Sequence, residues 1–272
     1  MLKIRIITAL IILPATLAVV FLAPPWVFRL VAAFLLMAGC WEFRRIADLA
    51  AGPGWALVAL QGSILAWMLW AWPVAGQDAL LLLAAGCMTW LVMFTRLGMF
   101  RAGAAPDRDF RRMGFLSALA AVTFCFFALA WLRDQARGDF IVFLLFLLIW
   151  ASDVGAYFSG RLLGRRKLAP VISPRKTWEG VYGGMLLAMA AAFLLAYGIA
   201  GLALPPLAVV VMAAVTTLSS VGGDLYISIH KRTVGLADTG TLFPGHGGML
   251  DRLDSVFAAL PVFFIGKLLL GL

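Results

Sequence analysis

Long apolar runs separated by short polar segments occupy the chain from end to end. Runs of about 17–25 apolar residues are long enough to cross a bilayer as α-helices. Segments rich in Gly and Pro, such as "APPW" and "AGPGW", separate several of them. The pattern predicts nine membrane-spanning helices, at approximately residues 6–22, 27–47, 54–75, 78–95, 113–132, 138–158, 179–200, 205–227 and 255–271.

The composition agrees with this pattern. Of the 272 residues, 64% are hydrophobic and 13% are charged, whereas soluble domains average about 45–50% and about 25%. We therefore expect an all-α integral membrane protein. The first apolar run follows Lys3 and Arg5, but "FLAPPW" is a poor signal-peptide cleavage site, so we expect this helix to be retained.

The basic residues predict the orientation of the chain. With a cytoplasmic N-terminus, 18 of the 22 Lys and Arg residues lie on the cytoplasmic side, 3 lie on the opposite side, and Lys267 lies within the last run. Membrane proteins concentrate Lys and Arg in their cytoplasmic loops. This bias also accounts for the net charge of +9, so we expect anionic membrane lipids rather than nucleic acid as partners.

One predicted cytoplasmic segment is more than a basic anchor. It reads "SDVGAYFSGRLLGRRKLAPVISPRKTWEG", Ser152 to Gly180. Asp153 lies near the end of an apolar run, where a carboxylate is costly and therefore a functional candidate. A positively charged anchor needs charge but no defined turns, and "SPRKTWEG" combines charge with turn-forming residues. This combination favours a binding role over an anchor.

A second cytoplasmic segment, "GGDLYISIHKRTVGLADTGTLFPGHGGMLDRLDS", carries the acidic candidates. Asp224 closes one apolar run, and Asp251 and Asp254 open the next at a spacing that puts both on one helix face. Glycines before Asp251 allow close backbone approach to an anion. Acids in a first helical turn can also serve only as caps. Two acids flanking Arg252 after a Gly-rich loop instead favour Mg²⁺ bridging to phosphates.

These residues resemble the signature of phosphatidate cytidylyltransferases (CDP-diacylglycerol synthases), which are integral membrane enzymes. "SPRKTWEG", "DVGAY" and the N-terminal "LKIRIITALIILP" also resemble the family, and the resemblance is dense from Asp153 onward. Two positions depart from it: Ala237 replaces a usual Lys, and Ile227 replaces a usual Glu. The matching signature residues are Ser228, Lys231, Arg232, Asp238, Pro244, Gly245, His246, Gly247, Gly248, Asp251, Arg252 and Asp254.

The resemblance implies that CTP and phosphatidate react to give CDP-diacylglycerol and pyrophosphate in phospholipid biosynthesis. It implies Mg²⁺ held by Asp224, Asp251 and Asp254, with a second cation left open, and Asp153 orienting water or metal. His246 joins these acids as a catalytic candidate through its place in the signature. Implied binders of the triphosphate and the lipid phosphate are Lys167, Ser173, Lys176, Lys231, Arg232, Gly247, Gly248 and Arg252; of these, Lys176, Lys231, Arg232 and Arg252 are also catalytic candidates.

We divide the chain into N-terminal transmembrane helices, residues 1–135, and a catalytic transmembrane domain, residues 136–272, with its site on the cytoplasmic side. The resemblance further implies a homodimer in the bacterial cytoplasmic membrane. One alternative is a divergent paralogue that acts on another membrane phosphate or has weakened catalysis, and the two departures support it. Another is an ion-coupled transporter, whose acids should lie near the bilayer midplane on broken helices.

Overall fold

Helices make up most of the computed structural model, which describes residues 2–73, 77–101, 103–199, 205–245 and 247–270. The predicted all-α class is therefore confirmed, with one small hairpin added. The elements in chain order are α1 (Leu2–Phe21), α2 (Pro25–Ile46), α3 (Ala51–Trp70), α4 (Gln77–Met99), α5 (Arg108–Arg133), α6 (Gly138–Leu163), β1 (Lys167–Ala169), β2 (Ser173–Thr177), α7 (Trp178–Phe193), the π-helical turn η1 (Leu194–Ile199), α8 (Pro206–Thr233) and α9 (Leu250–Leu270).

Local signals fix where several helices start. Pro25 and Pro206 occupy the first positions of α2 and α8, where the missing N–H would be unpaired anyway. The Asp107 carboxylate accepts a hydrogen bond from the Phe110 N–H at 2.7 Å and caps α5. The Thr177 hydroxyl likewise accepts from the Gly180 N–H at 3.1 Å and caps α7.

Seven of the described helices, α2 to α8, are long and apolar enough to cross a membrane, with α7 continuing through η1 to Gly198. Within the described residues α1 contributes a shorter apolar segment, Leu10–Phe21, and α9 is not among the seven. The helix positions agree with the predicted runs. The count of nine crossings and the side of the N-terminus stay predictions.

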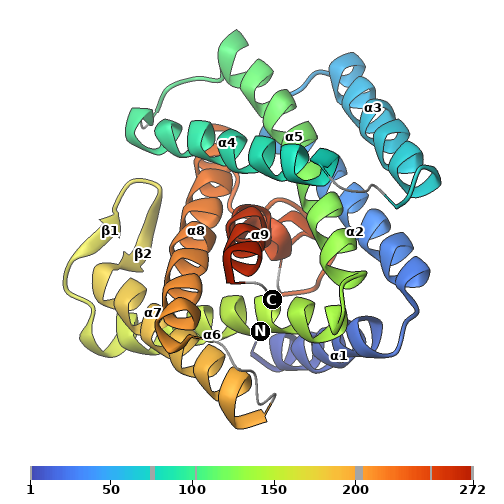
Figure 1. Ribbon diagram of the computed structural model, residues 1–272. Helices are drawn as coiled ribbons and strands as arrows, with labels where there is room; N and C mark the ends of the chain where they lie inside the picture. The colour runs from blue at the N-terminus through green and yellow to red at the C-terminus, as the bar shows by residue number, and fades with distance from the viewer. Residues whose placement is uncertain (1, 74–76, 102, 200–204, 246, 271–272) are drawn as a thin grey trace.

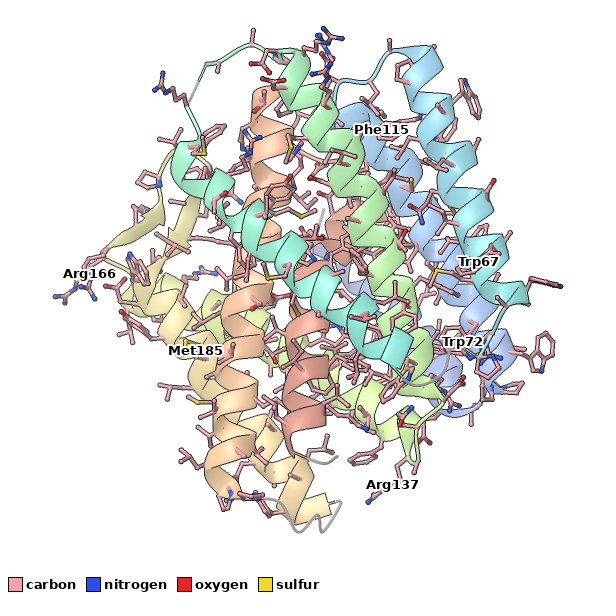
Figure 2. All side chains as sticks on the ribbon, turned by 45° about the horizontal axis from the view of Figure 1, so that its top comes forward. Trp67, Trp72, Phe115, Arg137, Arg166 and Met185 are labelled. Carbon is pink, nitrogen blue, oxygen red and sulfur yellow. The ribbon has the colours of Figure 1, made fainter. Side chains whose placement is uncertain are left out.

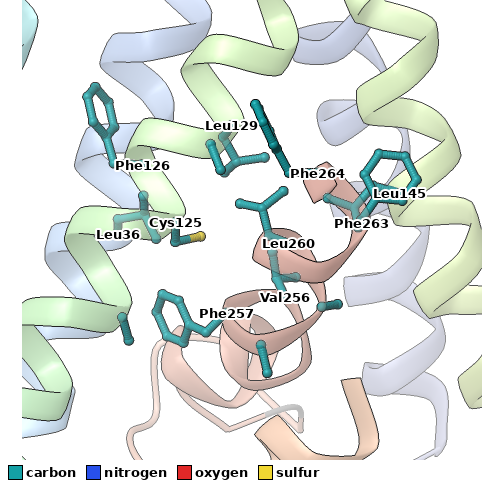
Figure 3. Close-up of a cluster of buried hydrophobic side chains, with 14 of the residues drawn as sticks. Leu36, Cys125, Phe126, Leu129, Leu145, Val256, Phe257, Leu260, Phe263 and Phe264 are labelled. Carbon is teal, nitrogen blue, oxygen red and sulfur yellow. The ribbon is translucent and has the colours of Figure 1, made fainter. Parts of the chain in front are cut away.

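Helix α9 lies at the centre of the bundle, with α2, α4, α5, α6 and α8 around it (Figure 1). Its Phe257, Leu260, Phe263 and Phe264 side chains are fully buried, and Figure 3 shows them among residues such as Leu36 of α2 and Cys125 of α5. The last predicted span is thus covered by protein on all these sides. The core joins residues from both predicted domains, and the division near residue 135 stays a prediction.

Helices α6 and α7 pack closely through glycines. A Cβ atom on Gly155 would come within 2.6 Å of the Gly183 carbonyl oxygen, and one on Gly184 within 2.7 Å of the Ser152 carbonyl oxygen. Small residues allow such backbone approach between membrane helices. This contact holds the start of α7, and the hairpin before it, against α6.

The basic segment between α6 and α7 folds into an antiparallel hairpin that the sequence did not predict. Lys167 pairs with Thr177 and Ala169 with Ser173. The Glu179 carboxylate accepts hydrogen bonds from the Arg165 and Arg166 N–H groups at 3.1 and 3.2 Å. Ile172, at the turn, packs on residues of α8, so the hairpin lies against α8.

Two helices extend beyond their predicted ends. Helix α6 continues to Leu163 and α8 to Thr233, so Asp153 and Asp224 lie within helices and not at their ends. The predicted ends fall short because hydropathy drops where polar residues accumulate, whereas a helix continues while its polar side chains find partners. In α8, Ser228 and Lys231 are buried and hydrogen-bonded to carboxylates.

Candidate active site at the start of α9

The first charged pair joins the hairpin to α8. Lys176 of β2 places its Nζ atom 2.5 Å from Oδ2 of Asp224, and both side chains are about a quarter exposed (26% and 28%). Ser228, one turn further along α8, donates a hydrogen bond from its hydroxyl to Oδ1 of Asp224 at 3.2 Å. The pair therefore remains accessible to a dissolved anion or cation.

The second pair joins α8 to α9. Lys231 Nζ lies 2.7 Å from Asp251 Oδ1, and these side chains are only 9% and 5% exposed. Lys231 lies seven residues after Asp224 in the chain, which is two helical turns on the same face. The two lysine–aspartate pairs thus line one side of α8.

Asp251 also organises the loop before α9. Its Oδ2 atom accepts hydrogen bonds from the Thr239 N–H at 2.8 Å, the Thr239 hydroxyl at 2.9 Å and the Gly248 N–H at 3.0 Å. Gly247 has a φ of +81°, and a Cβ atom there would lie 2.6 Å from Oδ2 of Asp251. Glycine at 247 therefore lets the loop pass close to the Asp251 carboxylate, while the predicted approach of this loop to a phosphate stays a prediction.

Glu42 of α2 is a site residue that the sequence analysis missed. It is buried, and its carboxylate accepts hydrogen bonds from the Thr239 hydroxyl at 2.7 Å, the Met249 N–H at 3.0 Å and the Leu250 N–H at 2.9 Å. It therefore caps α9 and fixes Thr239, which in turn holds Asp251. A glutamate inside an apolar run was the available signal, because such residues are costly in a membrane.

Asp153 and Asp254 approach the same cluster from α6 and α9. Asp153 is exposed and lies within electrostatic reach of Asp224, Lys176 and Arg252. Asp254 is buried, accepts a hydrogen bond from the Ser255 N–H at 2.7 Å, and is within electrostatic reach of Asp224. Three of the predicted acids thus share one electrostatic environment.

The remaining predicted residues differ in their surroundings. Arg232 is engaged in holding the fold, because its Nε donates to the Ile172 carbonyl at 3.3 Å and its Nη1 to the Leu236 carbonyl at 3.1 Å. Arg252 is exposed at the start of α9. Lys167 and Ser173 lie on the two hairpin strands, Lys167 exposed and Ser173 half-buried. His246 lies outside the described residues.

The donor set suits Mg²⁺ only together with a phosphate substrate. Among the residues that the structure describes, no group of three or more His, Cys, Asp or Glu side chains is arranged to hold a metal ion. Asp224 and Asp251 each contact a lysine instead. Magnesium in phosphoryl-transfer sites is usually held by one or two carboxylates plus substrate oxygens, so these acids fit that arrangement.

The two departures from the family signature differ in their surroundings. Ile227 is fully buried in the main hydrophobic core, so the bundle accommodates an apolar side chain there. Ala237 is exposed in the loop between α8 and α9, next to Asp238, which is also exposed. A cation missing at Ala237 therefore leaves open surface rather than a packing defect.

Comparison with known proteins identifies the family of the chain. The sequence model of the Cytidylyltransferase family matches residues 3–269. A phosphatidate cytidylyltransferase of Pseudomonas aeruginosa is 39% identical over 266 residues, which cover 97% of this chain and 96% of the relative. One of Haemophilus influenzae is 34% identical, with 97% of each chain covered, and one of Bacillus subtilis is 36% identical over 57% of this chain and 58% of the relative. The chain therefore belongs to the cytidylyltransferase family, on the branch of the phosphatidate cytidylyltransferases.

Proposed function

We propose that the two lysine–aspartate pairs form the centre at which this membrane enzyme converts CTP and phosphatidate to CDP-diacylglycerol and pyrophosphate. A phosphate oxygen of phosphatidate forms a bond to the α-phosphorus of CTP, and the bond from that phosphorus to the pyrophosphate oxygen breaks. The observation that carries the proposal is the meeting of Lys176, Asp224, Lys231 and Asp251 from three elements. Of these four, Lys231 and Asp251 also match the family signature.

The chemistry asks for positioning and charge neutralisation more than for a base. A phosphate monoester has a second pKa near about 6, so the attacking oxygen is already largely ionised at neutral pH. Lys176 and Lys231 then neutralise phosphate charge, and Arg252 adds an exposed cation at the start of α9. Because Lys176 is partly exposed, it can exchange its contact with Asp224 for a contact with an incoming phosphate.

Asp224 and Asp251, with Asp254 beside them, are the residues that would hold Mg²⁺. When bound, the ion would neutralise charge on the triphosphate oxygens. Asp224 supports this assignment best, because its carboxylate is partly exposed and within electrostatic reach of both Asp153 and Asp254. A second cation is compatible with this surplus of carboxylates.

Location follows from the two substrates. One is dissolved in the cytosol and the other is fixed at headgroup depth, so the reaction belongs at the membrane boundary. The chain is a multi-pass membrane protein with bacterial relatives. In this proposal the protein lies in the inner membrane and its site faces the cytoplasm. The family resemblance further implies that the protein is a homodimer.

The transporter alternative loses support from the geometry. Asp153 and Asp224 lie on α6 and α8, which are continuous helices of 26 and 28 residues. Transporter ion sites instead use helices that are broken near the midplane. A paralogue acting on another membrane phosphate is distinguished by assaying several lipid phosphates with CTP.

The test is turnover of radiolabelled CTP with phosphatidate by the purified full-length protein, over a titration of Mg²⁺. Asp224→Asn keeps the side-chain shape and should lower kcat/KM by about 100-fold or more, since a preorganised charge at the reacting phosphate is lost. Asp109→Asn makes the same chemical change at an exposed residue of α5. It is the matched control, and its kcat/KM should equal that of the natural protein. Natural-like turnover in Asp224→Asn, with the same Mg²⁺ dependence, would exclude this site.

A further inference from the structure

Two cavities border α5, and among the described residues neither is lined by a member of the candidate active site. The larger, of about 670 Å³, lies between the turn that joins α2 to α3 and the first turns of α5. The smaller, of about 450 Å³, lies between α4 and α5. Leu116 lines both cavities, so they adjoin at that residue.

Three arginines line the larger cavity. Arg111 is committed to Asp48, with its Nη2 2.7 Å and its Nε 2.9 Å from Oδ2. Arg112 makes only a loose contact of 3.8 Å with Asp109, and both side chains are more than half exposed, where an ion pair contributes little. Arg108 forms no ion pair with any residue that the structure describes. Two guanidinium groups are thus free to bind an anion.

The rest of the lining is apolar and continues along α5. Phe115, labelled in Figure 2 on the side of α5 that faces α2 and α3, lines the larger cavity together with Leu116. Met93 and Phe124 line the smaller one. At 1.5 Å per residue, the distance from Arg108 to Phe124 is about 24 Å, enough for a headgroup and one leaflet, which is half of the roughly 30 Å hydrocarbon core.

Aromatic residues place the larger cavity at headgroup depth. Arg44 lies 3.6 Å above the ring of Trp41, and Trp55 contacts Trp41 with ring centroids 5.0 Å apart. Trp41 precedes the α2–α3 turn and Trp55 follows it. Tryptophans with arginine at a helix end are typical of the membrane–water interface. The polar mouth of the cavity therefore lies where lipid phosphates are found.

We propose that the two cavities together bind one anionic diacyl phospholipid, at a site separate from the catalytic one. Arg108 and Arg112 hold its phosphate as charge-assisted donors, and one acyl chain passes over Leu116 into the crevice between α4 and α5. A free phosphate would use only the arginines. The apolar continuation identifies a lipid as the occupant.

The experiment measures binding of phosphatidylglycerol to the full-length protein in mixed micelles by native mass spectrometry. Two lost charge-assisted contacts should weaken binding about tenfold or more in Arg108→Gln/Arg112→Gln. Leu116→Gln should also weaken it, and because Leu116 is 57% exposed this change opens no cavity in the packed core. Arg101→Gln/Arg137→Gln removes the same charge from exposed residues outside both cavities and should leave binding unchanged.

Three results would overturn the proposal. Equal weakening by the control pair would mean a diffuse attraction to basic surface. Unchanged binding in Leu116→Gln would mean that the apolar crevice is unused. Displacement of the lipid by millimolar glycerol phosphate, which has the headgroup charge but no acyl chain, would identify a free-anion site instead.

Discussion

At the residue scale, burial separates the two lysine–aspartate pairs. Lys176 and Asp224 keep about a quarter of their side-chain surface exposed, whereas Lys231 and Asp251 keep less than a tenth. Exposed ion pairs contribute about 0–1 kcal/mol, but breaking a buried pair costs about 3–5 kcal/mol, because one charge is left uncompensated. The exposed pair is therefore suited to exchange partners with substrate, and the buried pair to hold α8 against α9.

This difference predicts a contrast in stability. Lys231→Met should lower the free energy of unfolding by about 3–5 kcal/mol because the Asp251 charge stays buried. The double variant Lys231→Met/Asp251→Asn should recover part of that loss, since neither charge remains. Lys176→Met, at the exposed pair, should lose no more than about 1 kcal/mol.

A denaturant titration of each purified variant in detergent measures these differences in the free energy of unfolding. Equal losses for Lys176→Met and Lys231→Met would contradict the assignment of one structural and one accessible pair. A double variant that is less stable than Lys231→Met would also contradict it, because the two buried charges would then not be partners.

Much of the site was predictable from residue types, but its partnerships were not. The sequence indicated Asp224, Lys231 and Asp251 as neighbours in function, since acids and cations meet there at the mouth of an apolar run. It did not pair Lys176 with Asp224, which depends on how a hairpin folds back on α8. Glu42 was missed because its three donors lie about 200 residues away in the chain.

At the element scale, the apolar runs located every described helix, because lipid requires each crossing segment to satisfy its own backbone. The ends were less predictable: polar residues continue α8 to Thr233 because the fold gives them partners. The strands β1 and β2 have only three and five residues, too few for an alternating pattern. Their pairing depends on contacts with Glu179 and α8 that only the folded chain provides.

The contact between α6 and α7 gives a prediction at this scale. Gly155→Ala places a Cβ atom within 2.6 Å of the Gly183 carbonyl oxygen, and such overpacking should cost about 1–3 kcal/mol of folding free energy. Gly98→Ala, in α4, is the matched control, because a Cβ atom there has nothing within 4 Å. The free energy of unfolding of Gly98→Ala should equal that of the natural protein or exceed it by up to about 1 kcal/mol.

Thermal unfolding of the two variants in the same detergent compares them directly. Turnover should fall in Gly155→Ala as well, since the hairpin with Lys176 connects these two helices. A Gly155→Ala protein as stable as Gly98→Ala would show that the helices separate easily, and that the close approach is unimportant to the fold.

At the scale of the whole molecule, the distribution of basic residues predicts which face meets the cytoplasm. Helix α6 has 26 residues, about 39 Å at 1.5 Å per residue, so its two ends should lie on opposite sides of the bilayer. In a Cys-free background, Pro170→Cys, at the turn of the hairpin, should react with an impermeant thiol reagent only from inside. Ala136→Cys, before α6, should react only from outside.

Both positions are exposed, so access to the reagent reports sidedness rather than burial. Inside-out and right-side-out vesicles provide the comparison. Labelling of Ala136→Cys from the cytoplasmic face would reverse the predicted orientation, and labelling of both positions from one face would contradict a crossing by α6.

The central place of α9 has a consequence for how the protein is made. Ribosomes deliver a chain from its N-terminus, and α9 follows every other described helix. The surrounding helices must therefore enter the membrane before the helix that fills their middle arrives. Since Asp251 and Asp254 come with that last helix, a nascent chain carries no complete site. An activity that depends on these two acids therefore begins only after α9 has docked.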